Sequence, residues 1–218
     1  QKHGKHHEYT MAILKNNRGV AYLGDERYVE AELDGTEAME YLQALSKKDP
    51  KTYSPTMLAA PLTILGTARL RLGELSAAEN YYREALVHID HPDAFRNANP
   101  VLAARSRACF ELTMALIKVR LGQVEEATTL TGKALDVLEL EAEELDPQTL
   151  VGLGQLAEEW IARNELVQAE RILKIGYAVG KVCPFHRENR RIIDAYTKLL
   201  RLSGRDGDVE LMQQWLLE

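Results

Sequence analysis

The sequence is poor in the residues that mark several large classes of protein. It has two cysteines, Cys109 and Cys183, which lie far apart with no metal-binding spacing, so neither a disulfide framework nor a zinc site is expected. Aromatic residues make up only 6%, and β-branched residues do not gather in short alternating runs, so no strand is predicted. No Asn-x-Ser/Thr sequon occurs, which fits an intracellular location.

An excess of positive charge and a long apolar run are also missing. The formal net charge is −6 and the pI is about 5.6, which counts against a nucleic-acid partner. No stretch reaches the length of a membrane span, and the N-terminus has no signal-peptide pattern. We therefore expect no membrane insertion and a cytoplasmic location. Because the first residue is Gln1 and not Met, we expect a fragment of a longer protein.

The residues that are abundant favour helices. Hydrophobic residues make up 45% and charged residues 28%, as in ordinary soluble domains. Leu, Ala and Glu are plentiful, and these residues lose little rotamer freedom in a helical turn. The composition therefore indicates a folded, helical chain.

Small residues recur with one fixed spacing, i, i+12 and i+19, in three segments. The sets are Gly66, Ala78 and Ala85; Ala115, Ala127 and Ala134; Ala157, Ala169 and Gly176. The last two members of each set are about two helical turns apart, so they share one face of a helix. Gly73, Gly122 and Asn164 lie where a first helix ends and a left-handed residue caps it. The pattern predicts packed helical hairpins.

This pattern resembles the tetratricopeptide repeat (TPR). The segment 62–92 has the pair Leu65-Gly66, the turn residue Gly73, and then Ala78, Tyr82 and Pro92. The resemblance implies an all-α, right-handed superhelical solenoid of about five antiparallel helix pairs. The alanines recur at intervals of 49 and 42 instead of the usual 34, which resembles the kinesin-light-chain-like variant and bacterial regulatory TPR domains.

The predicted map is one domain over 8–218 after a flexible tail at 1–7. Its helix pairs span approximately 8–46, 55–90, 100–141, 147–181 and 187–217, and every proline falls between helices or in a first turn. The terminal pairs are interpreted as degenerate copies. In the first, Gly19 and Ala38 are further apart than Gly66 and Ala78, which predicts a loop insertion around Gly24–Gly35.

The sequence contains no complete catalytic or cofactor-binding pattern, so we predict a protein that is not an enzyme and has no cofactor or metal. Gly152-Leu153-Gly154 and Gly132-Lys133 only echo phosphate loops, and both fall in predicted helices. The cluster of His3, His6 and His7 is interpreted as a solvated tail. The remaining histidines are interpreted as cations near helix C-termini, and they are His88, His91 and His186.

Charge is uneven near the C-terminus. The run Asp136–Asp146 is acidic and is interpreted as a solvated helix end. Six basic residues follow later, and they are Arg187, Arg190, Arg191, Lys198, Arg201 and Arg205. They form either a contact for an acidic partner segment or the positive outer face of an amphipathic helix.

The resemblance also implies a binding site, because first helices line a concave groove in this family. The predicted groove residues are Asn16, Asn17, Val20, Thr63, Ile64, Thr67, Leu70, Arg71, Leu112, Thr113, Leu116, Val119, Arg120, Gln155, Glu158 and Ile161. The carboxylate clamp of chaperone-binding members is not expected, since the aligned positions hold Asn16, Val20, Ile64, Cys109 and Thr113.

These features predict a scaffold or adaptor that holds a protein or peptide segment. The alternative is a sensory or regulatory domain of a larger protein that binds a small effector or signal peptide. The identity of the partner and the oligomeric state stay open.

Overall fold

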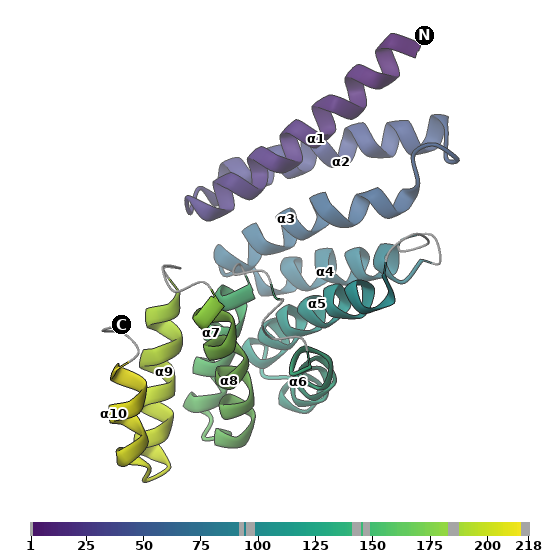
Figure 1. The fold of residues 1–218 in the computed structure, drawn as a ribbon. Helices are drawn as coiled ribbons and strands as arrows, with labels where there is room; N and C mark the ends of the chain where they lie inside the picture. The colour runs from purple at the N-terminus through teal and green to yellow at the C-terminus, as the bar shows by residue number, and fades with distance from the viewer. Residues whose placement is uncertain are drawn as a thin grey trace. The chain divides into compact units, whose positions relative to one another are not determined.

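The computed structural model describes residues 2–91, 94, 99–140, 145, 149–182 and 188–214, and every regular element in them is helical. In chain order these are α1 (Lys2–Gly24), α2 (Tyr28–Lys48), the short 3-10 helix η1 (Pro55–Leu58), α3 (Ala59–Arg71), α4 (Leu75–Ile89), α5 (Pro100–Arg120), α6 (Val124–Leu138), α7 (Thr149–Ala162), α8 (Leu166–Val182), α9 (Asn189–Leu202) and α10 (Asp206–Gln214) (Figure 1). The all-α prediction is confirmed, and the ten α-helices of the described residues follow one another as five pairs.

The chain divides into two compact units, residues 1–103 and 104–218, and each is described by itself. The division falls inside α5. Whether the five pairs form a single domain over 8–218 stays a prediction. Residues 1–7 were predicted to form a flexible tail, but α1 already begins at Lys2. Cys183, His186, Arg187 and the end of the acidic run beyond Leu140 lie outside the described residues, apart from Leu145.

One turn motif joins the two helices of every pair. Its central residue has a left-handed φ between 60° and 82°, and the five residues are Glu26, Gly73, Gly122, Asn164 and Gly204. In the pair α5–α6, the Gln123 N–H donates to the Lys118 carbonyl at 2.9 Å, and the Gly122 N–H donates to the Val119 carbonyl at 3.2 Å. These two bonds define a Schellman cap, which satisfies carbonyls that the helix end leaves open. The same two bonds recur in the other four pairs.

The small residues allow close approach between helices, as the repeat predicts. A Cβ atom on Gly66 would come within 2.7 Å of the Tyr82 ring, so α3 and α4 meet at a point where only glycine fits. Beside it, the hydroxyls of Thr67 and Tyr82 are hydrogen-bonded at 2.7 Å. Ala78 and Ala85 are completely buried on the facing side of α4. This pair therefore packs with its backbones close together, as a small-residue seam requires.

The first pair obeys the same rule, and the predicted loop insertion around Gly24–Gly35 is wrong. Gly35 is buried inside α2, against Ile64 and Leu65, and the helix is continuous there. The correct second residue is Ala31, because Gly19, Ala31 and Ala38 reproduce the i, i+12 and i+19 spacing. Both alanines are fully buried. The turn residue here is Glu26 and not glycine, so the sequence carried no conspicuous signal for this turn.

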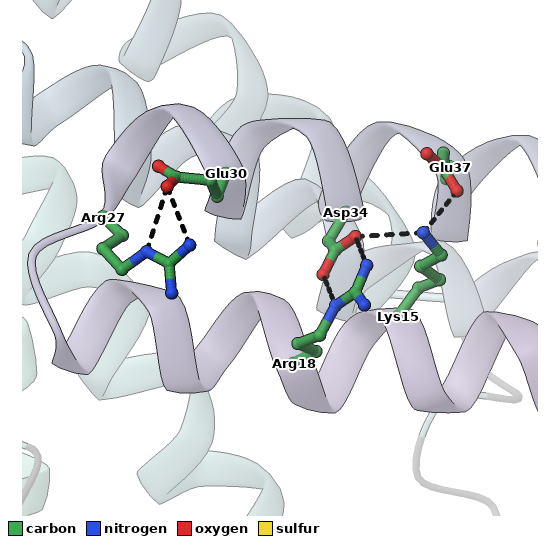
Figure 2. A network of polar contacts seen from close by, with 6 residues as sticks. All are labelled: Lys15, Arg18, Arg27, Glu30, Asp34 and Glu37. Atoms are coloured by element: carbon green, nitrogen blue, oxygen red, sulfur yellow. Dashed lines mark hydrogen bonds and ion pairs between the residues drawn. The ribbon is translucent and has the colours of Figure 1, made fainter.

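A charged network fixes α1 against α2 (Figure 2). The Asp34 carboxylate is only 1% exposed, and Arg18 binds it through two hydrogen bonds of 2.5 and 2.7 Å. Lys15 donates to the same carboxylate at 3.2 Å and pairs with Glu37 at 2.6 Å. The hydrogen bonds from Arg18 hold the pKa of Asp34 below its ordinary value. A bidentate, charge-assisted contact of this kind fixes the register of the two helices.

Unit 104–218 is held together by a large apolar core. Its fully buried side chains include Trp160, Leu135, Leu156 and Ile172. Helix α9 packs against α7, α8 and α10, with Ile193 and other apolar residues buried on one side. Helix α9 is therefore amphipathic, and a contact between its basic residues and an acidic partner segment stays a prediction.

Candidate binding surface

In each unit, the candidate site is the side of the first helices that their own pairs leave uncovered; we call it the first-helix surface. It belongs to α1 and α3 in unit 1–103, and to α5, α7 and α9 in unit 104–218. Its positions can be counted back from the left-handed turn residue t. Before Gly73, for example, Arg71, Leu70, Thr67 and Thr63 stand at t−2, t−3, t−6 and t−10. This count gives a common register for all five pairs.

In unit 1–103, this surface is made of α1 and α3. The two helices meet where a Cβ on Gly19 would lie 3.2 Å from Cδ1 of Ile64. Val20 follows Gly19 and is 53% exposed, and Asn17 is exposed one turn earlier. Thr63 and Thr67 on α3 are half-buried. The structure therefore brings predicted residues from two first helices to one neighbourhood, with an exposed valine beside amide and hydroxyl groups.

Seven of the predicted groove residues are buried in the structure, six of them apolar and one, Gln155, polar. The side chains that the structure buries are Ile64, Leu70, Leu112, Leu116, Val119, Gln155 and Ile161. They lie on the first helices as predicted, but on the sides that the neighbouring helices cover. The remaining nine are exposed or half-buried, and they are Asn16, Asn17, Val20, Thr63, Thr67, Arg71, Thr113, Arg120 and Glu158. These nine stay candidates for contact with a partner.

In unit 104–218, ion pairs connect successive first helices. Arg120 of α5 donates to Glu159 of α7 at 2.9 Å, and Arg163 binds the same carboxylate at 2.8 Å. Glu158 of α7 accepts from Arg191 of α9 at 2.9 Å. Arg120, predicted as a groove cation, is thus engaged within the unit. Its positive charge is partly compensated before any partner arrives.

Sequence reasoning assigned no groove residues to α9. Counting back from Gly204 to t−2, t−3, t−6 and t−10 gives Leu202, Arg201, Lys198 and Asp194. All four are exposed. The signal was present in the sequence, because Leu202-Ser203-Gly204 ends a helix as Arg71-Leu72-Gly73 does. The basic run was instead interpreted as either a contact for an acidic partner segment or the positive outer face of an amphipathic helix.

A separate pocket of about 440 Å³ opens beside α1 and α2. It is lined by Glu8, Glu37, Glu40, Tyr41 and Ala44. Two of its carboxylates already have lysine partners, since Lys48 lies 3.4 Å from Glu8 and Lys15 lies 2.6 Å from Glu37. None of the five residues was predicted as part of the groove. Because lysines already engage two of its three carboxylates, we do not take the pocket as the candidate site.

The motifs considered for chemistry have structural roles. Gly154 lies in α7 against Arg191, and Gly132 lies inside α6, so neither belongs to a phosphate loop. Within the described part of the chain, no group of three or more His, Cys, Asp or Glu side chains is arranged to hold a metal ion. His7 is exposed, while the side chains of His3 and His6 lie outside the described residues. None of the described helices combines the length and the apolar character that crossing a membrane requires.

The histidine prediction needs one correction. His88 lies in the last turn of α4, where we expected a cation favoured by the helix dipole. Burial instead lowers the pKa of His88, against an opposing effect of Glu84, and His91 lowers it further. Desolvation outweighs the attraction of Glu84, so the neutral imidazole of His88 is favoured.

Comparison with known proteins gives the same fold. The chain has the fold of the TPR-like repeat proteins. Its structure resembles BtubC (BKLC) from P. vanneervenii, with a TM-score of 0.56 and 13% identity over 95% of this chain and 87% of that chain. It also resembles a Podosopora anserina protein described as a putative kinesin light chain with nearly identical TPR-like repeats. A variant form of that protein has a TM-score of 0.52 and 18% identity over 96% of this chain and 92% of that one. No protein-family model and no curated protein matches the sequence.

Proposed function

We propose that this chain is a non-enzymatic interaction module, a scaffold or adaptor that holds a protein or peptide segment on its first-helix surface. The fold supports the proposal, because TPR-like repeats commonly mediate protein interactions. We further propose that the protein acts in the cytoplasm and does not bind nucleic acid.

The observation that carries the proposal concerns position t−6, six before each turn residue. Four of the five first helices have an exposed or half-buried side chain there, and these are Val20, Thr67, Glu158 and Lys198. The position thus stays open to solvent in both units after the core has formed. Its members are apolar, hydroxylic, acidic and basic in turn. Within each unit the exposed or half-buried members differ in chemistry, which suits a segment held by mixed contacts.

Val20 offers the sharpest test. We propose selecting peptides from a random displayed library on the full chain, and then titrating a selected peptide against Val20→Glu and Val29→Glu by fluorescence anisotropy. Both valines are exposed, at 53% and 66%, but Val20 lies on the first helix of the pair and Val29 on the second. The substitution is the same, and both occur in one helix pair. We expect Val20→Glu to weaken binding about tenfold, since it replaces an apolar contact with a charge.

Val29→Glu should leave the affinity within about twofold, because its site lies outside the proposed surface. Circular dichroism should show equal helix content for both variants and the parent. Loss of binding with Val29→Glu and normal binding with Val20→Glu would place the partner on the second helices. That result would contradict the proposal.

A further inference from the structure

The exposed face of α9 differs from the rest of the first-helix surface in its charge. We propose that this face binds an acidic segment of a protein partner, with Lys198 and Arg201 as its main contacts. The inference rests on the proposed function, because Lys198 occupies position t−6, the position that Val20, Thr67 and Glu158 hold on the first-helix surface. It adds the chemical class of the partner.

Most other cations of this unit are compensated internally. Arg171 pairs with Asp136 and Glu139 at 2.8 Å, and Arg205 pairs with Glu170 at 2.8 Å. Lys198 and Arg201 are exposed and have no carboxylate within ion-pair distance among the described residues. One turn of helix separates them, so they lie on the same face of α9. In an acidic protein, this leaves a small area of positive charge open to an incoming group.

Neighbouring side chains extend the area. Arg190 is 83% exposed, and its described carboxylate partner, Asp194, is distant at 3.7 Å and itself 68% exposed. Leu202 follows Arg201 and is 54% exposed. The face therefore combines two uncommitted cations, a third that is loosely held, and an apolar side chain at its C-terminal end. A segment with several carboxylates and an adjoining apolar residue complements it.

The same features disfavour other anionic partners. Nucleic-acid binders gain affinity by neutralising many phosphates, whereas Asp194 interrupts this face and Glu158 and Glu188 lie beside it on Arg191. Membrane-surface helices bury a broad apolar face in lipid, but α9 turns its apolar residues, such as Ile193 and Leu199, into the core. Side-chain carboxylates match the guanidinium of Arg201, which can bind them through two parallel hydrogen bonds.

The test uses two synthetic peptides of the same length, one with a block of six glutamates beside a leucine and one with glutamines in their place. Fluorescence anisotropy compares their binding to the full chain, to Lys198→Glu/Arg201→Glu, and to the control Lys47→Glu/Lys133→Glu. The control residues are also exposed, and the charge change is identical. Phosphatidylserine vesicles and a single-stranded DNA oligonucleotide serve as competing probes.

We expect the glutamate peptide to bind, the glutamine peptide to bind at least about tenfold more weakly, and the α9 variant to lose about tenfold while the control does not. Raising the salt concentration to about 1 M should weaken the interaction, because exposed charges are screened. Equal loss in the control would show that net charge alone is responsible, and tighter binding of DNA or vesicles would assign the face to another partner. Either result overturns the inference.

The two proposals fail in different ways. If Val20→Glu weakens a selected peptide and the α9 variant has no effect on the glutamate peptide, the first-helix surface stands and the acidic class is wrong. If the α9 variant alone has an effect, the acidic class stands and the wider surface is wrong.

Discussion

Replacing Gly122 by alanine tests the turn motif on which the register of the whole surface depends. Gly122 has a φ of 80°, and a Cβ added there would meet no atom within 4 Å. Any cost is therefore conformational and not steric. A left-handed L-residue costs about 1–2 kcal/mol, and the stiffer unfolded chain offsets about 0.4–1 kcal/mol of this. We expect Gly122→Ala to lower the free energy of unfolding by about 1 kcal/mol.

Gly132 provides a matched control in the same unit. It lies inside α6, and a Cβ there would likewise meet nothing within 4 Å. Because its backbone is helical, alanine should raise the free energy of unfolding by about 0.5–1 kcal/mol. The same chemical change is thus expected to have opposite signs at two positions, one in the turn and one in the helix that follows it.

The opposite substitution can be made at Glu26, which has a φ of 60° although it is not glycine. Glu26→Gly should stabilise the chain by about 0.5–1 kcal/mol, the left-handed cost minus the entropy that glycine adds to the unfolded state. Urea unfolding followed by circular dichroism measures all three variants, with the slope checked for constancy. If Gly122→Ala is neutral or stabilising like Gly132→Ala, the turn is not left-handed and the register is wrong.

Two pH predictions have opposite origins. Arg18 lowers the pKa of Asp34 in the folded chain, so the unfolded chain takes up the proton first as the pH falls below 3.8. The contribution of Asp34 to the free energy of unfolding is therefore complete above that pH and is lost below it. Asp34→Asn should cost about 2 kcal/mol at neutral pH and flatten the acid limb of the stability curve. The pKa of His88 is lowered by burial, so stability should fall as the pH drops below 6.5. This fall should be reduced in His88→Gln, and an unchanged pH dependence in urea titrations would contradict the burial argument.

Several elements of this fold could be predicted from the sequence because they depend on residues that are close together along the chain. Gly73, Gly122 and Asn164 mark helix ends through a backbone conformation that each residue adopts by itself. The repeated spacing of the small residues reflects helical geometry within one hairpin. These local rules predicted an all-α chain of helix pairs, which the structure confirms.

The same local rules failed where the signal was ambiguous. Gly35 was interpreted as a loop glycine, yet it is buried in α2 because Ile64 and Leu65 of another pair pack against it. Glu26 has the left-handed turn conformation, although glutamate is not a residue type that signals such a turn. Both errors came from the first pair, where no glycine marks the turn.

The sequence by itself determined the helices, the turns and the repeat that relates them, since these follow from spacing and backbone preference within one helix pair. Only the tertiary structure decided which first-helix positions reach solvent. Ile64 is buried by Gly19 and Gly35, and Arg120 is paired with Glu159, through contacts between segments far apart in the chain. Exposure and charge compensation depend on those distant neighbours. This is why only the structure could show that seven predicted groove residues are buried and that Lys198 and Arg201 are exposed.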